Sequence, residues 1–104
     1  MLKVSYEDAA TLLQNRRLDL ANGAIIQIRI WQLPHKTDER RHGLKYSLLY
    51  GRKDERIIGY DNEAGKGDHR HYRDREEPYS FTTMEKLIAD FWSDVRKEIE
   101  HERG

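Results

Sequence analysis

Apolar and polar residues alternate along two stretches of the chain that flank an Asn-Gly pair. The alternation of the second stretch is the pattern of a half-buried strand. Its inward positions are three isoleucines: Ile26, Ile28 and Ile30. Asn22-Gly23 predicts a two-residue type I′ turn, in which both residues have positive φ. We therefore expect a hairpin with strands near Leu12–Leu20 and Ala24–Leu33.

A second pair of β-rich stretches follows a charged segment, Pro34–Gly43, which we expect to be a connection exposed to solvent. In the first of these stretches, one face carries four apolar or aromatic residues: Leu44, Tyr46, Leu48 and Tyr50. A five-residue polar turn that begins at Gly51 separates this strand from the next, Arg56–Tyr60. "DHRHY", residues 68–72, is long enough for one more short strand. The pattern predicts a meander of four to five strands.

The C-terminal part of the chain has the period of a helix, from Thr83 to about His101. Thr82 and Glu85 have the spacing of a capping box. An apolar stripe recurs at helical spacing: Met84, Leu87, Ile88, Phe91, Trp92, Val95 and Ile99. The helix would be about 28 Å long, enough to lie diagonally across four strands.

These elements predict an α+β fold in one domain over residues 1–104. It consists of an antiparallel β-sheet meander of four to five strands and one long C-terminal helix packed on one face. The stretch Ser5–Gln14 is ambiguous, because Ser5 followed by Asp8 has the spacing of a capped helix while the hairpin pattern favours a strand.

Composition limits the chemistry. Cysteine is absent, which excludes disulfides, thiolate metal sites and thiol nucleophiles. Nineteen basic and nineteen acidic side chains cancel, so a nucleic-acid partner would have to bind a local basic patch. The first residues lack the apolar run of a signal peptide, and no stretch approaches the ~20 apolar residues of a membrane span. We expect a cytoplasmic protein with no membrane partner.

Polar and charged side chains are concentrated between Gly59 and Tyr79. On an extended backbone, the i, i+2 spacing of His69 and His71 places both imidazoles on one face, with Arg70 on the other. Two imidazoles beside a cation can cleave RNA without a metal. One ring removes the proton of the 2′-OH, the other protonates the leaving oxygen, and the cation stabilises the charged transition state.

Other side chains of this segment suit the same chemistry. Gly65 and Gly67 allow backbone N–H groups to approach a phosphate. Tyrosines can stack on bases. The catalytic candidates are His69, His71, Lys66, Arg70, Asp61 and Asp68, and the substrate-binding candidates are Gly65, Gly67, Arg73, Tyr60 and Tyr72. This hypothesis requires neither a cofactor nor a metal.

Two other classes of function stay open. His69 and His71 with Asp61, Glu63 or Asp68 would suit zinc or manganese in a metal-dependent hydrolase. The aromatic residues would also suit a non-catalytic module that binds a protein or a nucleic acid. The segment can equally be a salt-bridged surface loop, in which each ion pair contributes little to stability.

The stretch Tyr50–Val95 resembles the TumE family of bacterial and archaeal toxins. The resemblance rests on "GYDNE", "GKGDHRH", a later "PYSF" and the closing helix, and extends more loosely over "GAIIQIRIWQLP". The matching residues are Gly59, Tyr60, Asp61, Asn62, Glu63, Gly65, Lys66, Gly67, Asp68, His69, Arg70 and His71. The resemblance implies that the chain is the toxin of a type II toxin–antitoxin system. It also implies that the partner is an antitoxin with a helix-turn-helix domain. RNA as a second partner follows from the residues rather than from the resemblance, and a homodimer stays open.

Overall fold

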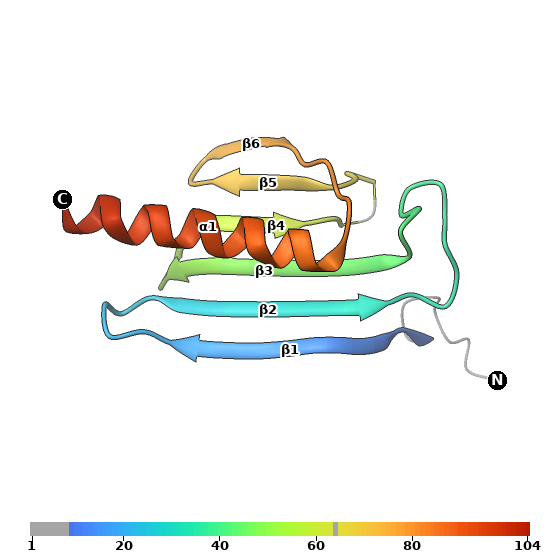
Figure 1. The fold of residues 1–104 in the computed structure, drawn as a ribbon, viewed down its shortest axis with the longest axis horizontal. Coiled ribbons are helices and arrows are strands. Elements are labelled where there is room, and N and C mark those ends of the chain that lie inside the picture. The colour runs from blue at the N-terminus through green and yellow to red at the C-terminus, as the bar shows by residue number, and fades with distance from the viewer. Residues whose placement is uncertain (1–8, 64) are drawn as a thin grey trace.

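The computed structural model describes residues 9–63 and 65–104 and has six strands and one long helix (Figure 1). The strands are β1 (Thr11–Asp19), β2 (Ile25–Gln32), β3 (Leu44–Arg52), β4 (Glu55–Asp61), β5 (His69–Tyr72) and β6 (Arg75–Pro78). They form one antiparallel sheet in the order β1-β2-β3-β4-β5-β6. The helix, α1, spans Met84–Arg103. The α+β meander predicted from the sequence is confirmed.

The sheet has six strands, whereas the sequence predicts four to five. The additional strand, β6, is exposed at all four positions and shows no apolar alternation. It pairs with β5 through its backbone, from Tyr72↔Arg75 to His69↔Pro78. A pattern of side chains cannot predict such a strand, because its side chains take no part in the core.

Both predicted turns differ in detail. Between β1 and β2, Gly23 has a φ of +84°, whereas Asn22 is not among the described residues with positive φ, so the turn is not type I′. The Leu20 N–H donates to Ala24 O and the Gly23 N–H to Leu20 O, which closes a three-residue turn. The turn between β3 and β4 comprises only two residues, Lys53 and Asp54, instead of the five predicted.

The helix begins one residue later than its predicted capping box requires. Thr83, not Thr82, is the N-cap, and its hydroxyl accepts a hydrogen bond from the Lys86 N–H. The residue three positions after Thr83 is thus a lysine, which cannot complete a capping box. Figure 1 shows α1 running nearly along β3 and β4 instead of diagonally across four strands.

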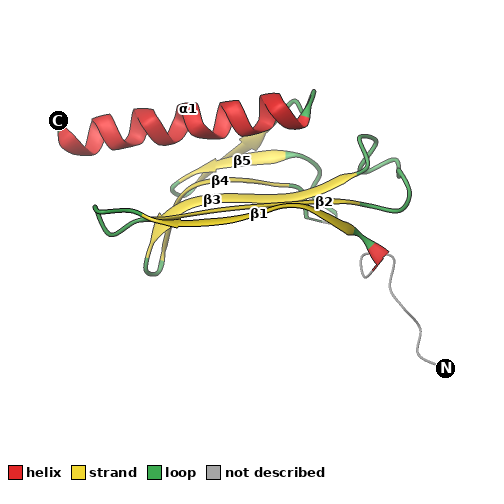
Figure 2. Cartoon of the chain, turned by 60° about the horizontal axis from the view of Figure 1, so that its bottom comes forward, coloured by secondary structure: helices red, strands yellow, loops and turns green. Residues whose placement is uncertain are grey.

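The core lies between α1 and one face of the sheet. Figure 2 shows α1 on that face, while no described element covers the other. The buried side chains include Ile26, Ile28, Ile30, Tyr46, Leu48, Tyr50, Ile58, Tyr60, Leu87, Phe91 and Val95. We call the uncovered face the open face. The cross-strand register places on it Arg17, Arg29, Trp31, Lys45, Ser47, Gly59, Asp61, His69 and His71.

Part of the ambiguous N-terminal stretch is now assigned. Leu13 and Gln14 belong to β1, which begins at Thr11. Ser5 and Asp8 lie outside the described residues. The strand interpretation is therefore confirmed from Thr11 to Gln14, whereas Ala9 lies in a 3₁₀ turn just before β1.

Candidate functional site

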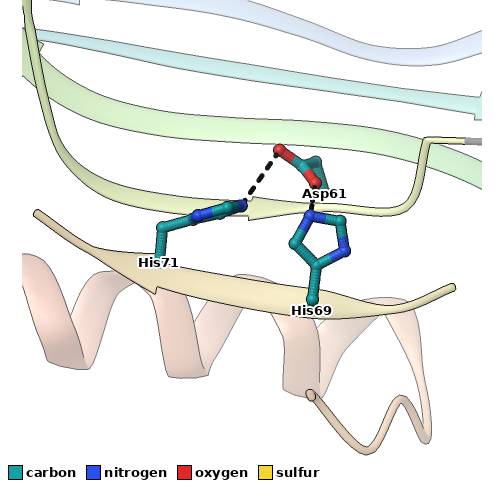
Figure 3. Close-up of side chains that lie close together, drawn as sticks. All are labelled: Asp61, His69 and His71. Atoms are coloured by element: carbon teal, nitrogen blue, oxygen red, sulfur yellow. Dashed lines mark ion pairs between the residues drawn. The ribbon is translucent and has the colours of Figure 1, made fainter. Parts of the chain in front are cut away.

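Asp61, His69 and His71 form a compact cluster on the open face. Asp61 at the end of β4 pairs with His69 on β5, and His71 follows two residues later, opposite Gly59. The imidazole rings lie 4.7 Å apart, and both histidines are buried. Figure 3 shows both rings on the side of β5 that faces away from α1, next to the Asp61 carboxylate. The i, i+2 spacing predicted this shared face.

Hydrogen bonding fixes the orientation of His69. Its Nδ1 lies 2.9 Å from the carbonyl oxygen of Gly67 and must donate, because a carbonyl only accepts. Its Nε2 is in ion-pair contact with Asp61 Oδ1 and lies 3.5 Å from Glu76 Oε1. The contact with Asp61 lacks the alignment of a hydrogen bond, so Oδ1 has no hydrogen-bond partner among the described residues. A proton on Nε2 would face two carboxylates.

In His71 the role of Nδ1 is reversed, because it accepts a hydrogen bond instead of donating one. The guanidinium of Arg56 places Nη2 3.0 Å from Nδ1 of His71. Since arginine only donates, Nδ1 accepts, and the neutral ring carries its proton on Nε2. That Nε2 is buried without a hydrogen-bond partner in the described chain, 3.8 Å from Asp61 Oδ2. Burial lowers the pKa of His71, and the positive charge of Arg56 lowers it further.

A bulge in the sheet brings Arg56 to this place. Simple alternation would put Arg56 on the same face as Ile58 and Tyr60, under α1. The register shifts between Tyr50 and Gly51, so that Tyr50 pairs with Ile58 but Gly51 pairs with Arg56. The shift turns Arg56 to the open face, as bulges often re-aim a side chain. Sequence reasoning missed this residue because it assumed an uninterrupted strand.

Gly59 provides the space for Arg56. A Cβ atom at Gly59 would lie 2.9 Å from Cδ of Arg56, so the arginine stem lies directly over the glycine. Gly59 also pairs with His71, which brings the guanidinium to the imidazole. Arg56 Nη1 lies 3.7 Å from Asp61 Oδ2. Arg56 is therefore a cation that contacts two members of the cluster, His71 and Asp61.

The cluster partly fits a metal. One ligand atom from each of Asp61, His69 and His71 lies within 4.8 Å of the others. His69 suits this role, since its Nδ1–H is bound to a carbonyl and its Nε2 points into the cluster, a common arrangement for metal ligands. His71 does not suit it, because Arg56 occupies Nδ1 as a donor and leaves the proton on Nε2. The donor set is therefore one histidine short while Arg56 is in place.

Asp68 belongs to a second cluster on the α1 side of the sheet. Its Oδ1 accepts from Tyr46 Oη at 2.6 Å and from His42 Nε2 at 3.0 Å. Burial opposes ionisation of Asp68, but these hydrogen bonds outweigh it and hold the pKa of the carboxyl below its usual value. The His42 ring also packs against Phe81. This cluster connects the segment 34–43 to the sheet.

The segment 34–43 is thus not only a solvated connection, as the sequence suggested. Arg40 is buried and donates from Nε and Nη2 to the carbonyl oxygen of Asn62. The Asn62 side chain in turn accepts from Tyr46 N–H and donates to Leu44 O, which continues the pairing between β3 and β4. Arg40 and His42 carry no sequence signal that separates them from the surrounding charged residues.

Arg70, the candidate cation on β5, and the neighbouring candidates Tyr72 and Arg73 make their contacts on the α1 side of the sheet. Arg70 contacts Glu77 and the Tyr60 hydroxyl, and Tyr72 donates to Glu98. Arg73 follows β5 and forms ion pairs with Glu55 and Glu98. A cavity of about 410 Å³ lies here between β5, β6 and α1. His71 is among its lining residues, although Figure 3 shows both imidazoles on the side of β5 that faces away from α1.

Gly65 and Gly67 lie in the connection between β4 and β5. Gly65 and Gly67 have φ values of +85° and +71°, the conformation that glycine tolerates best. The Gly65 N–H already donates to the Glu39 carboxylate, and Gly67 contributes the carbonyl that binds His69. Lys66 between them is exposed. Among the described residues, no hydrogen bond or ion pair joins Lys66 to His69 or His71.

Fold and site define a small α+β domain with an Asp–His–His cluster on the open face of an antiparallel sheet. The family model for toxin TumE matches residues 3–99, and the chain therefore belongs to the TumE toxin family. Membership implies a cognate antitoxin. No curated protein and no solved structure matches the chain. Among the described residues, no helix has the length and apolar character needed to cross a membrane.

Proposed function

We propose that this TumE toxin is a ribonuclease whose acid–base pair is His69 and His71. The observation that carries the proposal is the convergence of the two imidazoles, with rings 4.7 Å apart, on Asp61 at the open face. The two rings have different environments, which is what a pair of unlike proton-transfer groups requires.

His71 acts as the base in this proposal. Burial and Arg56 lower its pKa, so the ring is neutral near pH 7. Its lone pair is on Nδ1, where Arg56 donates. A substrate phosphate attracts the Arg56 guanidinium away from Nδ1, which leaves this lone pair to take the proton of the 2′-OH. Arg56 then stabilises the negative charge of the pentacoordinate phosphorus.

His69 acts as the acid. Asp61 and Glu76 face its Nε2, and the Gly67 carbonyl holds its Nδ1–H. As the 2′ oxygen bonds to phosphorus and the bond from phosphorus to the 5′ oxygen breaks, Nε2 gives its proton to the leaving oxygen. The products are a 2′,3′-cyclic phosphate and a 5′-hydroxyl. Asp61 orients His69 and compensates its charge.

A metal-dependent hydrolase is the second candidate. It is favoured by two buried polar atoms of the cluster that have no hydrogen-bond partner in the described chain, Asp61 Oδ1 and His71 Nε2. It requires Arg56 to leave His71 so that the proton moves to Nδ1. A chelator distinguishes the two candidates, because only the metal-dependent enzyme would lose activity.

Growth of bacteria that express the chain tests the proposal at the level of the cell. We expect the wild type to arrest growth and a His69→Asn, His71→Asn variant to permit it. Arg16→Gln, an exposed change on the other face of the sheet, should arrest growth like the wild type. A folded double variant with full toxicity would exclude the histidine pair and favour a binding module. Co-expression with the antitoxin, for which we propose a helix-turn-helix protein, should restore growth.

A further inference from the structure

We infer that the open face is a binding platform for single-stranded RNA, which runs from the Asp–His–His cluster across β4 and β3 to Trp31 on β2. The inference rests on the proposed ribonuclease function and adds the class and the path of its substrate. It starts from a second cavity, of about 330 Å³, that the cluster and the platform share.

This cavity is continuous with the candidate site. Asp61 lines it together with Trp31, Lys45, Ser47, Arg40 and Glu63. The register explains the neighbourhood, because Asp61 pairs with Ser47, Ser47 with Arg29, and Lys45 with Trp31. From β5 to β2 the path crosses three strand spacings, about 14 Å. A chain of a few nucleotides can therefore extend from the histidines to Trp31.

The charges of the open face complement a polyanion although the whole chain is neutral. Arg17, Arg29, Lys45 and Arg56 present four cations from four consecutive strands. Two of them are near carboxylates of the same face: Asp19 pairs with Arg17, and Asp61 Oδ2 lies 3.7 Å from Arg56. Arg29 and Lys45, which flank Trp31 in the register, are the cations that would contact phosphates along this path.

Trp31 indicates single-stranded rather than double-stranded RNA. Trp31 is half-buried and lines the cavity, so part of its indole is within reach of a ligand, and the Lys45 ammonium lies 5.6 Å from the ring centre. Ser47 is a small residue between Trp31 on β2 and Asp61 on β4, and it lines the cavity with them. Unpaired bases stack on such a side chain, whereas the bases of an A-form duplex are already stacked on one another.

Fluorescence anisotropy with a labelled eight-nucleotide oligouridylate tests the platform, in the His69→Asn, His71→Asn background so that cleavage does not interfere. Trp31→Ala should weaken binding at least tenfold, and Trp31→Phe should largely restore it. Arg29→Gln should lower the slope of log K against log salt by about 0.7, the effect of one phosphate contact on a single strand. Arg16→Gln is the matched control, an exposed arginine on the other face, and should change neither quantity.

Three results would overturn the platform: equal binding by Trp31→Ala and the parent, equal effects of Arg29→Gln and Arg16→Gln, or equal affinity for a duplex of the same length. Failure of the platform and failure of the ribonuclease are distinguishable. If the wild type cleaves RNA but Trp31→Ala and Arg29→Gln cleave equally well, the platform is wrong and the ribonuclease stands. If the chain binds the oligonucleotide through Trp31 but cleaves no RNA, the ribonuclease is wrong.

Discussion

Arg56 and His71 are joined by a 3.0 Å contact from the guanidinium Nη2 to the imidazole Nδ1. This contact fixes the tautomer of the ring and, with burial as the larger cause, lowers the pKa of His71. Arg56→Gln removes the positive charge and leaves an amide on a shorter side chain. We expect the pKa of His71 to rise in this variant, as measured by NMR titration of the imidazole. RNA cleavage should fall, because the transition state loses its cation.

Arg16→Gln is the control for that titration, since Arg16 lies on the opposite face of the sheet. It should leave the pKa of His71 unchanged. An Arg56→Gln variant whose His71 titrates like the wild type would show that Arg56 does not act on the ring.

Gly59→Ala tests the position of Arg56 without altering its charge. The new Cβ would lie 2.9 Å from Cδ of Arg56, the middle of a flexible side chain, so the arginine should move while the sheet stays intact. We expect a loss of stability at the lower end of the 1–3 kcal/mol that overpacking typically costs, and a loss of cleavage close to that of Arg56→Gln. Urea denaturation and an RNA cleavage assay measure the two effects.

Gly51→Ala is the comparison. There a Cβ would lie 2.4 Å from the backbone oxygen of Glu55, which cannot move aside without disturbing the turn. This variant should lose more stability than Gly59→Ala. If Gly59→Ala cleaves RNA at the wild-type rate, Arg56 does not need its observed position.

The lowered pKa of His71 predicts how stability changes with pH. The unfolded chain binds a proton at His71 near pH 6.5, the ordinary value, and the folded chain binds it only at lower pH. This contribution to the free energy of unfolding is therefore complete above about pH 6.5 and is lost as pH falls through the folded-state pKa. Urea denaturation between pH 5 and 8 should give a flatter profile for His71→Asn than for the wild type. Identical slopes would contradict a lowered pKa.

Asp61 and Asp68 are a matched pair, since both were candidates for catalysis and the structure separates them. Asp68 accepts from His42 and Tyr46 on the α1 side, so Asp68→Asn should destabilise the fold by about 1–3 kcal/mol. Cleavage by the folded fraction should persist. Asp61→Asn should reduce cleavage, because Asp61 contacts both histidines. If the Asp68→Asn variant cleaved no RNA at a temperature where it is fully folded, the structural role assigned to Asp68 would be wrong.

The sequence predicts what depends on periodicity and local spacing. The alternation of β2 and β3, the stripe of α1 and the shared face of His69 and His71 follow from it directly. It does not predict Arg56, because a register shift reverses the face of a strand residue and leaves no trace in the apolar pattern. It also does not predict β6 or the role of His42, which depend on backbone pairing and on a contact with Asp68 across 26 residues.

The most direct test of the central claim is digestion of total RNA by the purified chain, with and without a chelator, followed by analysis of the product ends. The account predicts fragments with 2′,3′-cyclic phosphate and 5′-hydroxyl ends that form equally well with the chelator. Loss of either histidine should slow their formation by about 10²–10⁴-fold. Fragments that disappear with the chelator, or no fragments from a folded and toxic protein, would contradict it.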